Sequence, residues 1–182
     1  MEQLRLNGIV SLEITGECNS NDGMMLVLSK ILPNLQEINL SNTGFGYQAF
    51  ILHLFSKNCI RLEKVTWNNI NQSMIILGSN LRFAKNLKEI YMDDCVFYQH
   101  CNPLPATVFF FHGCSKVLER VSIRNAKYII HRLGSTPEHV PQKALIKFVQ
   151  NSPLSLRWFR SSLTNENMIM LRSERPGIEF LN

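Results

Sequence analysis

Five side chains that can bind zinc lie within twenty residues of one another: Cys95, His100, Cys101, His112 and Cys114. Thiolate sulfur and imidazole nitrogen are common zinc ligands, so metal binding is the first chemistry to consider. Structural zinc sites place their ligands in closely spaced pairs, whereas this segment has the spacing C-x4-H-C-x10-H-x-C. Free cysteines are also among the most buried side chains in proteins, and we therefore predict no metal site here.

Covalent catalysis finds no support in the residue pattern. Cys101 follows His100 directly, and neighbouring side chains of an extended chain point apart, so the two do not form a thiolate–imidazole pair. The sequence contains no G-x-S-x-G motif, no glycine-rich phosphate loop and no H-E-x-x-H motif. We predict a protein that is not an enzyme and needs no cofactor.

Basic residues gather in the last third of the chain. Residues 1–60 contain 3 basic and 5 acidic side chains, whereas residues 113–182 contain 11 and 5. Arginine and tryptophan are enriched at interaction hot spots, which draws attention to Trp158 beside Arg160. Basic and aromatic residues do not interleave as in nucleic-acid-binding modules, which argues against a nucleic-acid ligand. The charge favours a protein partner with an acidic surface.

Length and composition predict one globular domain spanning residues 1–182. The chain is 45% hydrophobic and 18% charged, which is typical of a folded protein. No stretch approaches the roughly 18 to 20 apolar residues of a membrane span, so we expect no membrane association. The first residues do not resemble a signal peptide, and the 5 cysteines are an odd number. Together these features favour reduced thiols in the cytoplasm or the nucleus.

Short apolar triplets recur along the chain with the two-residue alternation of a half-buried strand. Their central residues Leu12, Ile38, Val65 and Ile90 are separated by 26, 27 and 25 residues. Later steps of 31, 38 and 19 residues are irregular. Strands are therefore expected at 9–14, 35–40, 62–67, 87–92, 118–123, 156–161 and 178–180. Helical spacing and capping residues predict helices at 22–30, 46–57, 72–83, 107–112, 141–150 and 164–172.

The repeated strand and turn L-x-x-L-x-L-x-x-[NTC]-x-L resembles the leucine-rich repeat, in its ribonuclease-inhibitor-like and cysteine-containing subclasses. Residues 59–62 are similar to the C-x-x-L that opens a cysteine-type repeat, and Cys95 falls on the Asn/Cys turn position. The resemblance implies an α/β solenoid, or horseshoe, with parallel strands on the concave face and helices on the convex face. Regular repeats span about 9–128, and irregular repeats with a loop insertion at 133–141 span about 129–182.

The turn lacks the asparagine ladder of the family. The preceding position is polar in four successive repeats, at Asn42, Asn69, Asp94 and Asn125. Asn and Asp side chains form hydrogen bonds within turns, so we expect these residues to stabilise the turns instead.

The resemblance favours a non-catalytic protein–protein interaction scaffold or adaptor. The alternatives are the substrate-receptor portion of a ubiquitin-ligase complex and a regulator of a GTPase or other enzyme. Stacked strands align their outward side chains in columns, and these are the predicted partner-binding residues: Glu37, Asn39, Lys64, Thr66, Glu89, Tyr91, Asp93, Arg120, Arg124, Trp158 and Arg160. Apolar residues near both ends of the array predict that an additional domain, a partner or self-association covers at least one end.

Overall fold

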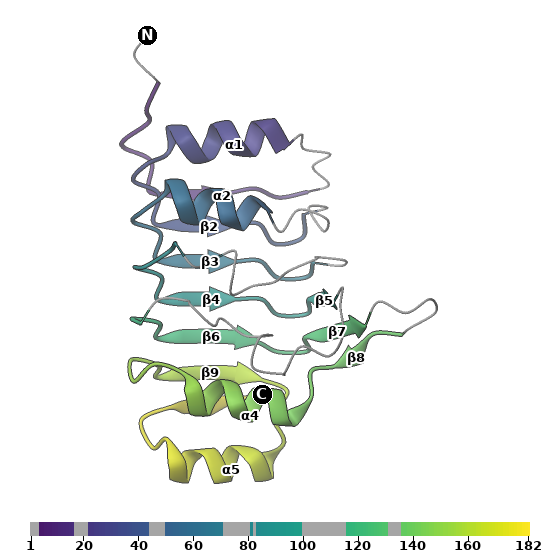
Figure 1. Ribbon diagram of the computed structural model, residues 1–182. Coiled ribbons are helices and arrows are strands. Elements are labelled where there is room, and N and C mark those ends of the chain that lie inside the picture. Colours follow the sequence, from purple (N-terminus) through teal and green to yellow (C-terminus); the bar gives the residue numbers. More distant parts are fainter. Residues whose placement is uncertain are drawn as a thin grey trace.

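Seven short parallel strands form the main sheet, and they follow one another in the order of the sequence (Figure 1). They are β1 (Ser11–Glu13), β2 (Glu37–Asn39), β3 (Lys64–Thr66), β4 (Glu89–Tyr91), β6 (Arg120–Ile123), β9 (Trp158–Ser161) and β10 (Glu179–Leu181). The computed structural model describes residues 4–16, 22–43, 50–70, 81, 83–99, 116–130 and 136–182. The predicted α/β class is confirmed, because the main sheet is parallel and described helices follow β1, β2, β8 and β9 in the chain.

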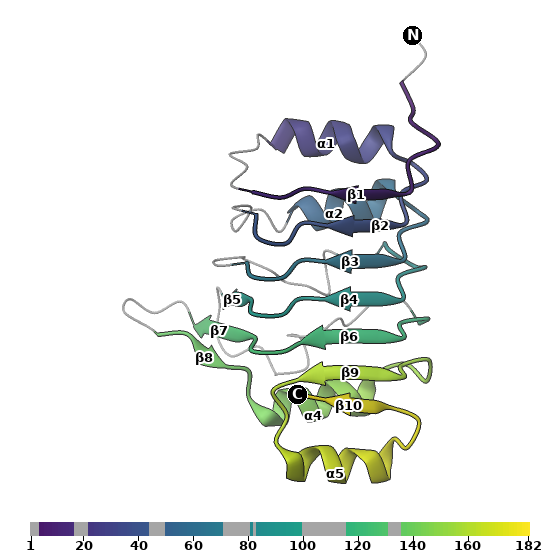
Figure 2. The same cartoon turned by 180° about the vertical axis from the view of Figure 1, so that it is seen from behind.

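The described residues form four helices: α1 (Asp22–Ile31), α2 (Phe50–Asn58), α4 (Gln142–Asn151) and α5 (Asn165–Glu174). In Figure 1 α2 and α4 lie in front of the sheet, and in Figure 2 they lie behind it, so both cover the same face. Helix α1 packs beside α2, and α5 packs against α4 and β10 at the far end of the sheet. In the described part of the chain, no helix has the length and apolar character needed to cross a membrane.

The core lies between the sheet and the helices. Its centre is a row of apolar residues that the parallel register places opposite one another: Ile38, Val65, Ile90, Val121 and Phe159. All five are buried, as are the apolar residues that flank each strand, such as Leu35 and Leu40 around β2. The helices contribute their apolar faces, for example Phe55 of α2 and Phe148 of α4. The alternation seen in the sequence is therefore the alternation between core and surface.

The turns that follow the strands share one backbone conformation. Asn42, Asn69, Asp94 and Asn125 have φ angles of 58°, 55°, 57° and 55°, and Gly16 holds the matching position after β1 with φ 90°. Asn, Asp and Gly tolerate this left-handed region better than other residues. The amide of Asn69 donates to Oδ1 of Asn42 at 2.9 Å, and that of Asn125 donates to Oδ1 of Asp94 at 2.9 Å. These side chains therefore supply hydrogen bonds at the turns, as expected, and the bonds join one turn to the next.

A second sheet of three strands was not expected from the sequence. It contains β5 (Val96–Gln99), β7 (Lys127–Ile130) and β8 (Glu138–His139), with β5 parallel and β8 antiparallel to β7. Within the segment 133–141, which was expected as a loop insertion, Glu138 and His139 form a short strand that pairs with β7. The hydroxyl of Tyr128 donates to Oε2 of Glu138 at 2.9 Å, which joins the two strands further.

The boundaries of the other elements differ little from the prediction. All seven expected strands are present; six are shorter than the expected range, and β10 has the expected length but begins one residue later. Four expected helices correspond to α1, α2, α4 and α5. The expected helix at 107–112 lies outside the described residues, and the one at 72–83 lies almost entirely outside them. Ile9 was expected in the core, yet 38% of its surface is exposed, because β1 is an edge strand of the sheet.

Truncating Ile38 tests the register of the sheet. Ile38→Ala should lower the free energy of unfolding by about 2–5 kcal/mol, because it leaves a cavity between β1 and β3. Its neighbour Glu37 is exposed, and Glu37→Ala should change stability by no more than about 0.5 kcal/mol. Urea denaturation of both variants measures the difference, and equal midpoints would contradict the described register.

Substitutions of Asn69 test the shared turn conformation. Asn69→Ala and Asn69→Gly both remove the hydrogen bond to Asn42, but only alanine opposes the left-handed backbone. The glycine variant should be more stable than the alanine variant by about 1 kcal/mol, after allowing for the greater entropy of glycine in the unfolded chain. Urea denaturation measures both values, and a more stable alanine variant would rule out a left-handed turn at this position.

Candidate interaction surface

One face of the main sheet is free of helices in the described part of the chain, and we call it the outer face (Figure 2). The register places its side chains in three columns that run across β2, β3, β4, β6 and β9. The first column is Glu37, Lys64, Glu89, Arg120 and Trp158. The second is Asn39, Thr66, Tyr91, Ser122 and Arg160. The third lies just beyond the strands and is Ser41, Asn68, Asp93, Arg124 and Ser162.

Tyr91, Arg120, Trp158 and Arg160 form a contiguous group that we call the aromatic–arginine cluster. The ring centroids of Tyr91 and Trp158 are 6.0 Å apart, although their strands β4 and β9 are separated by β6. The guanidinium carbons of Arg120 and Arg160 lie 5.5 and 5.7 Å from the centroid of Trp158. Cations at this distance from an indole are attracted to its π electrons. The cluster thus places aromatic area and positive charge together.

The hydroxyl of Tyr91 is held at the edge of the cluster. It donates to Oε2 of Glu89 at 3.0 Å, and Nζ of Lys64 lies 5.8 Å from the centre of its ring. Burial raises the pKa of Tyr91, and the hydrogen bond to Glu89 raises it further. The phenol therefore stays neutral at physiological pH, and Tyr91 presents an uncharged ring to a partner.

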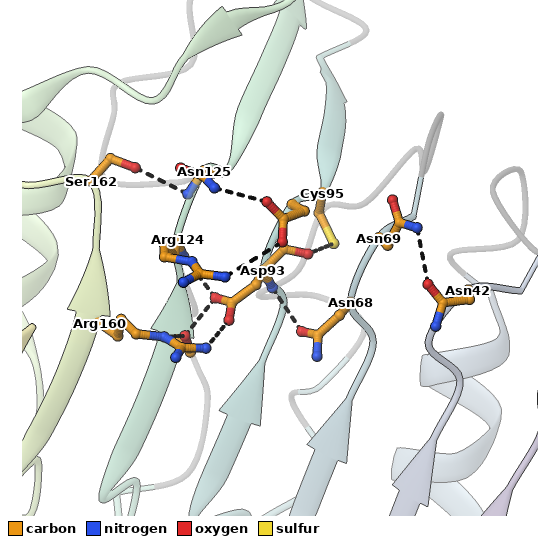
Figure 3. Close-up of polar contacts among 11 residues, drawn as sticks. Asn42, Asn68, Asn69, Asp93, Cys95, Arg124, Asn125, Arg160 and Ser162 are labelled. Carbon is orange, nitrogen blue, oxygen red and sulfur yellow. Dashed lines mark hydrogen bonds and ion pairs between the residues drawn. The ribbon is translucent and has the colours of Figure 1, made fainter. Parts of the chain in front are cut away.

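Asp93 was expected at the surface, but only 3% of it is exposed. Its Oδ1 accepts hydrogen bonds from the hydroxyl of Ser122 and from the backbone N–H of Arg124, and its Oδ2 accepts one from Arg160 (Figure 3). Nε of Arg160 also donates to the hydroxyl of Ser122 at 2.8 Å. These bonds link three strands, because Asp93 follows β4, Ser122 belongs to β6 and Arg160 to β9. They also explain why Asp93 is buried, since the hydrogen bonds from Ser122, Arg124 and Arg160 replace those that its carboxylate would form with water.

The third column repeats one hydrogen bond from strand to strand. The backbone N–H of Asn68 donates to the hydroxyl of Ser41 at 2.9 Å, and that of Asp93 donates to Oδ1 of Asn68 at 2.8 Å. The backbone N–H of Arg124 then donates to Oδ1 of Asp93 at 2.8 Å. Figure 3 shows the bond from Asp93 to Asn68 beside the bonds between turn residues. These side chains satisfy main-chain donors where the strands end, so the third column supports the fold.

The other predicted site residues lie on the outer face but apart from the cluster. Asn39 donates to Oε1 of Glu13 at 2.8 Å near the β1 edge, and Glu37 and Thr66 occupy the same half of the sheet. Nη2 of Arg124 is 3.9 Å from Oδ2 of Asp94, so its side chain reaches toward the turn that follows β4. Ser122 was not among the predicted site residues. It is 0% exposed, and its hydroxyl is bonded to both Asp93 and Arg160. Its place between Tyr91 and Arg160 in the second column was the signal that could have found it.

Of the five residues considered as zinc ligands, only Cys95 lies in the described part of the chain. Its Sγ donates to the carbonyl oxygen of Trp67 at 3.0 Å and also contacts the carbonyl of Asp93. The other four residues considered as zinc ligands lie outside the described residues: His100, Cys101, His112 and Cys114. Within the described ranges, no three His, Cys, Asp or Glu side chains are grouped so as to hold a metal ion.

Burial raises the pKa of Cys59 and of Cys95 to about 12. At pH 8 each thiolate should then be about a thousandfold scarcer than that of a free cysteine. In a Cys18→Ser, Cys101→Ser, Cys114→Ser variant, iodoacetamide should label both remaining thiols slowly in the folded protein and rapidly in urea, as measured by mass spectrometry. Fast labelling of the folded variant would contradict the described burial.

The same shifts predict how stability depends on pH. The folded-state pKa lies above the unfolded one, so the contribution of each neutral thiol is complete below about pH 9 and is lost as the pH rises toward 12.

Comparisons with known proteins give no family for this chain. No protein-family model matches the sequence, and no curated protein matches it. What the outer face can bind therefore follows from its own side chains. Two features bear on it: an aromatic–arginine cluster over β4, β6 and β9, and a set of buried polar bonds that fixes the side chains beneath it.

Proposed function

We propose that this chain is a leucine-rich repeat protein whose α/β fold is a solenoid, and that it is a non-catalytic scaffold or adaptor. In this proposal a protein partner binds to the outer face, which is the concave face of the array. The supporting observation is that seven parallel strands in chain order keep one register, so that their outward side chains form columns on a face free of described helices. Such a row of fixed side chains suits a large, extended ligand.

The chemistry of the columns favours a protein ligand. Tyr, Trp and Arg are the residues most enriched among those that dominate protein–protein binding energy, and the cluster combines all three. The strands and buried polar bonds hold these side chains in place before binding, which lowers the entropy cost of association. Glu13 and Glu37 lie toward the β1 edge, whereas Arg120 lies toward β9, so the partner would meet charge of opposite sign along the sheet.

The proposal is tested by capture of partners with variants of the two faces. Tyr91→Ala with Trp158→Ala should weaken binding of a captured partner by at least about thirtyfold, or about 2 kcal/mol, because both rings leave the interface. The control is Lys143→Glu with Lys147→Glu on α4, on the opposite side of the sheet. It should bind like the wild-type protein, by pull-down and by titration calorimetry.

Two results would contradict the proposal. One is that the α4 pair abolishes binding while the double alanine variant binds normally, which would place the interface on the helices. The other is that the chain chemically converts every captured protein and forms a stable complex with none of them. Circular dichroism of each variant keeps a loss of fold separate from a loss of binding.

A further inference from the structure

The two arginines of the cluster have different surroundings. Arg160 is bonded to the buried carboxylate of Asp93 and to the hydroxyl of Ser122, so its charge is neutralised and its position is fixed. Arg120 forms no ion pair with any other described residue, and it is exposed. Its neighbour in the first column, Glu89, accepts the hydroxyl of Tyr91 instead. The guanidinium of Arg120 lies beside the Trp158 ring and the Tyr91 hydroxyl, and no described carboxylate neutralises its charge.

On the basis of the proposed function, we infer that the cluster binds an extended acidic segment of a partner protein, with a carboxylate on Arg120 and an adjacent apolar side chain on Tyr91 and Trp158. We assign Arg160 and Asp93 as positioning residues, which hold Trp158 against Tyr91 and do not themselves contact the ligand. A carboxylate suits this place because the charge of Arg120, which no described carboxylate neutralises, matches a single negative charge. A doubly charged phosphate would leave one of its charges unmatched by Arg120 and next to Glu89 on the neighbouring strand.

Packing beneath the rings supports the positioning role. Tyr91 and Trp158 come from strands that are not neighbours, and their rings approach over β6, where the small residue Ser122 is completely buried. Arg160 contributes to this packing, since its guanidinium lies beside the indole of Trp158 and is bonded to Asp93 and Ser122. Without that bond the indole loses a fixed neighbour on its own strand.

Substitution of Asp93 separates the two roles of Arg160 by the sign of the effect. If Arg160 contacted the acidic ligand, Asp93→Asn would free its guanidinium and tighten binding. If Arg160 only positions Trp158, the same change weakens binding, although it removes a negative charge from the site. The double variant Asp93→Asn with Arg160→Gln has the net charge of the wild-type protein and leaves no buried charge unpaired. It should also weaken binding.

The experiment uses a fluorescein-labelled decapeptide of alternating glutamate and leucine, with a lysine–leucine peptide as its control. Binding to the full chain is followed by fluorescence anisotropy over a range of salt concentrations. Arg120→Gln should weaken binding of the acidic peptide roughly tenfold and reduce its salt dependence, because a contact charge is lost. The charge-neutral double variant should weaken binding at least about threefold with unchanged salt dependence, because an anchor has moved and no contact charge has been lost.

Acrylamide quenching of tryptophan fluorescence gives a readout that needs no ligand. Trp67 is buried, so quenching reports mainly on Trp158, and Trp158→Phe identifies its share. Quenching should increase in the charge-neutral double variant, and it should increase less in Arg120→Gln, because the Arg120 guanidinium also lies beside the indole but is not held by a buried carboxylate. If Asp93→Asn alone does not fold, the double variant and Arg160→Gln still decide the assignment, since Arg160 is partly exposed.

Each other outcome overturns a defined part of the inference. Tighter binding by Asp93→Asn, or a salt dependence that falls in Arg160→Gln as it does in Arg120→Gln, would make Arg160 a contact residue and refute the positioning role. Unchanged quenching in the double variant would refute it too. If the acidic peptide does not bind the wild-type protein, or binds no better than the lysine peptide, the acidic ligand is wrong. The scaffold function is judged separately, by the partner captured through Tyr91 and Trp158.

Discussion

The register between strands of only three or four residues is the constraint on which the rest of this structure depends. Each strand places one side chain at the centre of the core, and these side chains align as Ile38, Val65, Ile90, Val121 and Phe159. A slip of one residue would move Glu37 or Asn39 into the position of Ile38, because alternate side chains point to opposite faces. Burial of the apolar row therefore also fixes the columns of the outer face, and with them the approach of Tyr91 to Trp158.

The main sheet could be predicted because its determinants are local and repeated. An apolar residue between two polar ones, recurring at steps of 25 to 27 residues, gives both the strand and the face that it buries. The second sheet lacks such a signal. Strands β5 and β7 begin directly after the left-handed turns, and β8 has two residues that are both exposed, so their pairing follows from where the turns direct the chain. No period of apolar residues marks them.

The interaction surface was predictable in outline but not in its internal contacts. Alternation identified the side chains that leave the core, including Tyr91, Arg120, Trp158 and Arg160. It could not identify which of them remain open, because that depends on residues far away in the sequence. Asp93 is bonded to Arg160, which is 67 residues further along the chain, and to Ser122, which is 29 residues further along. A pattern within one repeat contains no information on such contacts.

Whether a neighbouring main-chain N–H finds a backbone carbonyl decides whether an outward polar side chain belongs to the fold or to the surface. Within the strands, main-chain donors and acceptors are satisfied by the neighbouring strand. The side chain of Arg120 is therefore not needed to satisfy the backbone, and it forms no ion pair with a described residue. Just beyond the strands, the N–H groups of Asn68, Asp93 and Arg124 would lack a partner, and the side chain of the preceding repeat accepts each of them. Polar side chains at this level are fixed by the backbone that they satisfy. Arg160 connects the two levels, because it stands in a strand yet is bonded to Asp93 at the strand end, and this explains why two arginines of one cluster have different roles.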